Sequence, residues 1–167
     1  SMMGSTRSLS FRNFAIAERS VRSNRNSIGS LPKSFLSCAA IAAGYGIELD
    51  LQLTSDEQAL VFHDYDLGRL SNETGPIRQR TAEEARDITL KHGDGETIPT
   101  LTEVLQIVDG QVPLLIELKD QDGGMGVDIG PLEQATATAL TGYSGPVAVM
   151  SFNPNSIRRM ADLAPDL

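Results

Sequence analysis

Apolar runs alternate with amphipathic stretches along the chain from about residue 34 onward. Continuous apolar character predicts buried strands over 14–17, 46–53, 59–64, 112–119 and 146–151. A helical spacing of apolar positions predicts helices over 34–44, 81–90, 100–110, 131–140 and 153–163. Strands separated by helices indicate a parallel sheet covered by helices, and therefore the α/β class.

Capping signals place the starts of three of these helices. Thr81 with Glu84, and Thr100 with Glu103, have the spacing of a capping box, in which each side chain accepts a backbone N–H of the other residue. Asn153, followed by a proline, is a third capping position. The pattern is compatible with a doubly wound sheet or with a barrel, and the sequence contains neither a dinucleotide-binding glycine fingerprint nor a P-loop.

The length of 167 residues suits a single domain, and an apolar content of 40% is sufficient for a globular core. We expect residues 1–13 to be a tag remnant with an N-terminal extension, and residues 14–167 to form the domain. The apolar stretch around Cys38 is too short and too glycine-interrupted for stable membrane insertion. A lone cysteine cannot form an internal disulfide, so a reducing, cytoplasmic location is expected.

The formal net charge of −8 is unevenly distributed. Residues 1–33 carry six basic residues and one acidic residue, whereas the rest of the chain carries 8 basic and 21 acidic residues. The basic start lacks the interleaved aromatic residues of a nucleic-acid arm. The acidic remainder argues against nucleic acid as a partner, because phosphate backbones repel it.

Two carboxylates lie within the apolar strand predicted over 46–53. Glu48 and Asp50 are two residues apart, so both side chains point to the same face of the strand, and Glu117 and Lys119 repeat this spacing in a later strand. Carboxylates that converge at neighbouring strand ends repel one another unless a cation balances them. The sequence offers no cysteine pair or histidine cluster, so a hard cation, Mg²⁺ or Ca²⁺, is favoured over zinc.

The chain has two histidines, which occupy different settings. His63 closes the predicted strand 59–64 and stands next to Asp64, a position suited to a general acid or base because histidine titrates near neutral pH. His92 lies in a polar loop and is interpreted as solvated.

Five blocks of the sequence resemble successive blocks of the glycerophosphodiester phosphodiesterase family, within the phospholipase C-like phosphodiesterases: AIAERS, AAIAAGYGIELDLQLTSDEQALVFHDYDLGRLSNETG, IPTLTEVLQIV, VPLLIELK and SFNPNSIRRMADLAPDL. The resemblance implies that the chain folds as a TIM-type (β/α) barrel and takes part in lipid metabolism. Such a barrel hydrolyses small-molecule glycerophosphodiesters to glycerol 3-phosphate and an alcohol with a divalent cation, Mg²⁺ or Ca²⁺. In the family's usual account, one group activates the glycerol 2-hydroxyl, a second protonates the departing alcohol, and water then opens the cyclic phosphate.

The resemblance also implies roles for individual residues. The implied metal ligands are Glu48, Asp50 and Glu117, the implied catalytic histidine is His63, and the implied phosphate-holding residues are Arg19 and Lys119.

Two features of the sequence depart from the family pattern. The family's first strand normally ends in His-Arg-Gly, whereas here Glu18 stands in the position of that catalytic histidine and precedes Arg19. The family's Pro-Glu-Asn block is replaced by residues that supply no carboxylate. We therefore expect impaired activity, with a non-catalytic phosphodiester-binding module as the alternative. A different Mg²⁺-carboxylate barrel enzyme, such as an enolising lyase, is a further alternative.

A closed barrel of this type takes about 250 residues and eight strands, whereas the pattern predicts five. The chain is thus expected to be an incomplete barrel. Either it is truncated relative to its gene, or a partner copy supplies strands, or the sheet closes differently. Alone, such a piece would be marginally stable or would form a homo-oligomer, because its strand edges are open.

Overall fold

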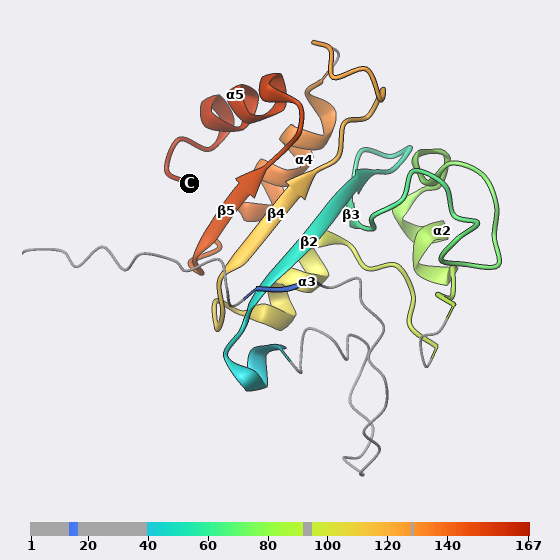
Figure 1. Cartoon of the computed structure of the whole chain (residues 1–167), viewed down its shortest axis with the longest axis horizontal. Coiled ribbons are helices and arrows are strands. Elements are labelled where there is room, and N and C mark those ends of the chain that lie inside the picture. Colours follow the sequence, from blue (N-terminus) through green and yellow to red (C-terminus); the bar gives the residue numbers. More distant parts are fainter. Residues whose placement is uncertain (1–13, 17–39, 92–94, 128) are drawn as a thin grey trace, which may run out of the picture.

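A computed structural model describes residues 14–16, 40–91, 95–127 and 129–167 (Figure 1). The strands of the described part form one sheet and are β1 (Phe14–Ile16), β2 (Gly46–Leu53), β3 (Ala59–Val61), β4 (Leu114–Leu118) and β5 (Val147–Met150). The strand order is β1-β2-β4-β5, and these four strands are parallel. The predicted positions Glu18, Arg19, Cys38 and His92 lie outside the described residues.

The predicted helices are confirmed where the structure describes them. They are α2 (Ala82–Asp87), α3 (Leu101–Val108), α4 (Pro131–Leu140) and α5 (Pro154–Leu163), with a short 3-10 turn, η2, at Ile77–Gln79. Of the helix predicted over 34–44, residues 40–43 are described and are helical. Both capping boxes form at the starts of α2 and α3, and Asn153 caps α5 by accepting a hydrogen bond from the N–H of Asn155 at 3.0 Å.

The main hydrophobic core lies between one face of the sheet and the helices α3, α4 and α5. Alternate residues of β2, including Leu49 and Leu51, point to this face and are almost fully buried. They pack with Ile116 of β4, Val104 of α3 and Leu132 of α4 in one continuous cluster. Figure 1 shows α3 and α4 on the same side of the sheet, so the opposite face of β2 and β4 is available for polar side chains.

The structure corrects the prediction for residues 59–64. This segment is a strand only over Ala59–Val61, and it pairs with the end of β2 in an antiparallel manner rather than joining the parallel sheet. The loop between the two strands is too short for the crossover that a parallel pair requires, so the chain forms a hairpin. A second, smaller hydrophobic cluster follows the hairpin and includes Phe62, Leu67 and Ile98.

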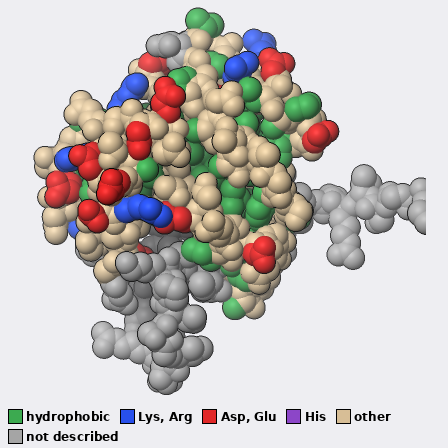
Figure 2. Space-filling model, turned by 180° about the vertical axis from the view of Figure 1, so that it is seen from behind, with side chains coloured by type: hydrophobic (Ala, Val, Ile, Leu, Met, Phe, Trp, Pro, Cys, Tyr) green, Lys and Arg blue, Asp and Glu red, His purple; other side chains and the backbone are tan. Residues whose placement is uncertain are grey.

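Figure 2 shows the molecule from the side opposite to that of Figure 1. Acidic and basic side chains are intermixed on the side that carries α2, and hydrophobic side chains are visible over the middle of this face. Among the described residues, no helix combines the length and the apolar character that a membrane crossing requires.

Candidate active site

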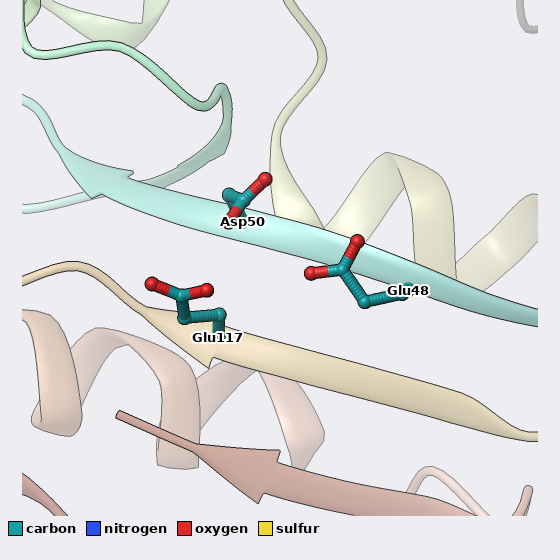
Figure 3. A group of neighbouring side chains, drawn as sticks. All are labelled: Glu48, Asp50 and Glu117. Carbon is teal, nitrogen blue, oxygen red and sulfur yellow. The ribbon is translucent and has the colours of Figure 1, made fainter. Parts of the chain in front are cut away.

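Three carboxylates converge on the polar face of the sheet. Asp50 of β2 and Glu117 of β4 are cross-strand partners in the parallel register, and Glu48 precedes Asp50 by two residues on the same face. One oxygen from each of the three side chains lies within 4.8 Å of the others. Figure 3 shows the three carboxylates gathered between β2 and β4. The structure therefore brings together the three residues that the sequence predicted as metal ligands.

Lys119 lies against two of these carboxylates. Its Nζ atom is 2.8 Å from Asp50 Oδ1 and 2.7 Å from Glu117 Oε1. Burial alone would lower the pKa of Lys119, but the hydrogen bonds to Asp50 and Glu117 outweigh burial and raise that pKa, so the side chain is a cation. Lys119 thereby offsets part of the repulsion between two nearly buried carboxylates.

The carboxylate cluster suits a hard divalent cation. Its ligand atoms are all oxygens, and each carboxylate has a second oxygen, so Asp50 and Glu117 can contact Lys119 and an ion at once. Ca²⁺–oxygen bonds measure about 2.3–2.6 Å, so oxygens up to about 5 Å apart can share one Ca²⁺ ion. Mg²⁺, with bonds of about 2.1 Å, would require the oxygens to lie within about 4.2 Å of one another.

His63 lies two residues beyond β3 rather than at the end of a strand as predicted, and its main chain is anchored beside β2. The carbonyl of His63 accepts a hydrogen bond from Gln52 Nε2 at 3.1 Å, and the preceding N–H, of Phe62, donates to the carbonyl of Asp50 at 3.0 Å. This anchoring places His63 beside the strand that carries two of the carboxylates.

The imidazole of His63 is oriented by Asp64, which is itself held by Arg69. Nδ1 of His63 lies 2.7 Å from Asp64 Oδ1, while Nε and Nη2 of Arg69 donate to the same carboxylate at 2.6 and 2.7 Å. The hydrogen bonds from Arg69 are the main cause of a lowered pKa of Asp64, with His63 assisting against the opposing effect of burial. A carboxylate can only accept, so Nδ1 of His63 carries the proton in this contact.

A cavity of about 450 Å³ lies beside His63 and Lys119. Its lining residues come from three separate segments and are His63, Asp64, Tyr65, Asp66, Arg69, Lys119 and Phe152. His63 and Lys119 thus line one common space, and Lys119 links it to Asp50 and Glu117, which do not line it themselves. This cavity is large enough to hold a small polar molecule.

Hydrogen bonds connect the loop after β4 to the start of α5. Asn153 is fully buried, and its Nδ2 atom donates to Asp120 Oδ1 at 2.8 Å and to the carbonyl of Gly126 at 2.9 Å. Ser151 Oγ donates to the carbonyl of Leu118 at 2.8 Å. These bonds hold the backbone on both sides of Lys119, which lies between Leu118 and Asp120.

Sequence reasoning missed two polar residues of the site. Arg69 orients Asp64, and Gln121 donates to the carbonyl of Lys119 at 2.6 Å and contacts Gln52 Oε1 at 3.4 Å. Both lie in polar loops, where neither spacing nor an apolar flank distinguishes a functional side chain from a solvated one. Only the folded structure shows that Arg69 contacts Asp64 and that Gln121 contacts Gln52 and the carbonyl of Lys119.

A family model described as "Glycerophosphoryl diester phosphodiesterase family" matches residues 34–167. The chain belongs to this family. The match includes the three carboxylates, His63 and Lys119, and it begins after Glu18 and Arg19. Because the chain belongs to this family, the alternative of a different barrel enzyme, such as an enolising lyase, is not favoured.

Individual relatives agree with the family assignment. The chain is 36% identical over 130 residues to a glycerophosphodiester phosphodiesterase of Caldanaerobacter subterraneus subsp. tengcongensis, a match that covers 73% of this chain and 52% of the relative. It is 28% identical over 137 residues to a glycerophosphodiester phosphodiesterase of Bacillus subtilis, covering 72% of this chain and 47% of the relative. The chain spans about half the length of the curated relatives it matches.

Solved structures confirm the fold class. A phosphodiesterase of Oleispira antarctica, in complex with sn-glycerol-3-phosphate, superposes with a TM-score of 0.69 at 24% identity, covering 78% of this chain and 56% of the other. A glycerophosphodiester phosphodiesterase of Agrobacterium tumefaciens superposes with a TM-score of 0.66 at 24% identity, covering 79% and 56%. Such relatives are TIM-type barrels, and the four described parallel strands with helices on one face correspond to an incomplete barrel.

Proposed function

We propose that the site serves the metal-dependent hydrolysis of glycerophosphodiesters to glycerol 3-phosphate and an alcohol. The observation that carries the proposal is the convergence of Glu48, Asp50 and Glu117 beside Lys119, in a chain of this family. The names of the relatives support the reaction class. An Mg²⁺ or Ca²⁺ ion bound by the three carboxylates would polarise the phosphoryl oxygens of the substrate.

In this proposal Lys119 and His63 act on the substrate from the same cavity. The ammonium group of Lys119 neutralises phosphoryl charge, because it is a cation and is held in place by two carboxylates. His63 transfers a proton to or from an oxygen of the diester through Nε2, since the contact with Asp64 keeps a proton on Nδ1. We propose that Arg19 is a further phosphate-holding residue and that Glu18 replaces the second proton-transfer group, which would impair turnover.

The test measures release of glycerol 3-phosphate from glycerophosphocholine by the full chain after removal of metal with EDTA and re-addition of Ca²⁺ or Mg²⁺. We expect activity to require the added cation. Glu117→Gln should lower the activity at least about a hundredfold, because it removes one of three charged ligands. Glu83→Gln, at an exposed glutamate of α2, is the matched control and should retain activity. Cation binding by calorimetry without turnover of any glycerophosphodiester would contradict hydrolysis and would favour the binding module.

A further inference from the structure

His63 and Lys119 both lie just beyond the strands that lead to them. β3 ends at Val61 and β4 ends at Leu118. The three carboxylates, by contrast, lie within β2 and β4, where the parallel register fixes the backbone that carries them. Strand pairing therefore places the carboxylates, whereas the carbonyl groups of His63 and Lys119 lie outside this pairing and are held by other groups.

Two glutamine side chains hold these two carbonyls. Gln52 Nε2 donates to the carbonyl of His63 at 3.1 Å, and Gln121 Nε2 donates to the carbonyl of Lys119 at 2.6 Å. Gln121 Nε2 also lies 3.4 Å from Gln52 Oε1, and its own Oε1 accepts the N–H of Leu53 at 3.3 Å. The two amides, the glutamine pair, thus form a continuous series of hydrogen bonds from the backbone of His63 to that of Lys119.

The contacts fix the orientation of both amides. A backbone carbonyl can only accept, so each Nε2 must face its carbonyl, and the oxygen of Gln52 is then left to accept from Gln121. In the same arrangement the oxygen of Gln121 faces a backbone N–H, which can only donate. Reversing either amide would set an oxygen against a carbonyl oxygen. The glutamine pair therefore has a single hydrogen-bonded arrangement.

The position of Gln52 is a costly one for an amide. Its side chain is on the same face of β2 as Glu48 and Asp50, and it is 1% exposed. A buried amide destabilises a fold unless its hydrogen bonds are made. Neither Gln52 nor Gln121 lines the cavity beside His63 and Lys119, so any effect of the pair on the reaction acts through those two residues.

We propose that Gln52 and Gln121 are coupled positioning residues, which together set the separation between the proton-transfer group and the phosphate-neutralising cation of the site. This inference rests on the proposed function, in which His63 and Lys119 act on the substrate. Groups that act on one substrate must be placed accurately, since a displacement of about 1 Å can lower a rate about a hundredfold. Loss of either amide breaks the only series of hydrogen bonds that joins the two carbonyls among the described residues.

The test is a double-mutant cycle on the hydrolysis of glycerophosphocholine under saturating cation. Gln52→Met and Gln121→Met keep the length of the side chain and remove its hydrogen bonds, and each should lower kcat about tenfold per folded chain. The double variant should show about the same tenfold loss, because either change alone already breaks the pair. KM should change less than kcat, and the Kd of the cation should not change, because strand pairing places the carboxylates. Gln134→Met, at an exposed glutamine of α4, is the matched control and should retain kcat.

Losses that multiply to about a hundredfold in the double variant would overturn the coupling, and an unchanged kcat in either single variant would overturn the positioning role. A cation Kd weakened as much as kcat would also overturn it, because it would show a general loss of structure.

If the unaltered chain hydrolyses no glycerophosphodiester, the proposed function fails separately, and the glutamine pair is tested by NMR. The chain has two histidines, so the ring signal of His63 is assigned with His92→Gln. The coupling stands if Gln121→Met shifts the ring signal of His63 while Gln134→Met leaves it in place. It is wrong if Gln121→Met does not shift that signal, or if both variants shift it equally.

Discussion

Asp50 and Glu117 are direct cross-strand partners on adjacent parallel strands, and both side chains are nearly buried. Like charges in such positions destabilise a sheet. Lys119, the one residue that contacts both through a single ammonium group in the described part of the chain, offsets this repulsion. Glu48 adds a third carboxylate to this cluster, an arrangement that could hold a metal ion.

Divalent cations should stabilise the folded chain. Ca²⁺ or Mg²⁺ at a hundred times its Kd should raise the free energy of unfolding by about 2.7 kcal/mol, because the cluster is assembled in the folded state alone. Urea titrations with and without the cation measure this difference. Glu117→Gln should abolish most of the cation response, whereas Glu83→Gln should retain it. An equal response in both variants would place the bound cation elsewhere.

Lys119→Met should destabilise the metal-free chain by about 3 kcal/mol, because it leaves two nearly buried carboxylates side by side without their cation. Urea unfolding in EDTA measures the change. Saturating Ca²⁺ should reduce the deficit, since the ion can replace the missing positive charge. Arg158→Met, at an exposed position of α5, is the control and should have little effect. Unchanged stability in EDTA would contradict the bridging role.

The contribution of Asp64 to the free energy of unfolding should depend on pH in the acid range. The hydrogen bonds from Arg69 lower the folded-state pKa of Asp64 below its ordinary value of 3.8, so its contribution is present above that pH and is lost as the pH falls through the lowered pKa. Asp64→Asn should cost about 1 kcal/mol at pH 7, a modest amount because Arg69 is largely exposed. The deficit should shrink as the pH falls below 3.8, the ordinary pKa of an aspartate. A deficit that stays constant from pH 7 to pH 2.5 would exclude the ion pair as its cause.

Asn153→Ala should destabilise the chain by about 2 kcal/mol, because it removes the side-chain donor to Asp120 Oδ1, one of the two side-chain donors to the carbonyl of Gly126, and the cap of α5. Thermal unfolding provides the measurement. Asn155→Ala, which removes a single side-chain bond to Gly126, is the comparison and should cost less. An equal loss of thermal stability in the two variants would argue that the bond from Asn153 to Asp120 and its cap on α5 contribute little.

Glu18→His should raise turnover of glycerophosphocholine at least tenfold, because a positioned histidine is a stronger proton-transfer group near neutral pH than a glutamate. Release of glycerol 3-phosphate under saturating cation is the measurement. Glu18→Gln, which cannot transfer a proton, should not give this increase. Activity that is unaffected by either change would remove Glu18 from the catalytic machinery.

Local sequence rules predicted most of the elements. The residue pairs Thr81/Glu84 and Thr100/Glu103 marked the starts of α2 and α3, because a capping box involves groups three residues apart and needs no distant partner. Apolar runs located every strand of the described sheet to within three residues at each end. The two-residue spacing also determined that Glu48 and Asp50 share one face of β2, since side chains alternate along a strand.

The tertiary structure decided which strands become neighbours and which side chains meet. It placed β3 antiparallel to β2, paired Asp50 with Glu117, and brought Lys119 between them. It also brought Tyr65 and Phe152 to one cavity. Spacing along a strand is a property of the local backbone and can be read from the sequence, whereas register and the meeting of loops depend on how distant segments pack together.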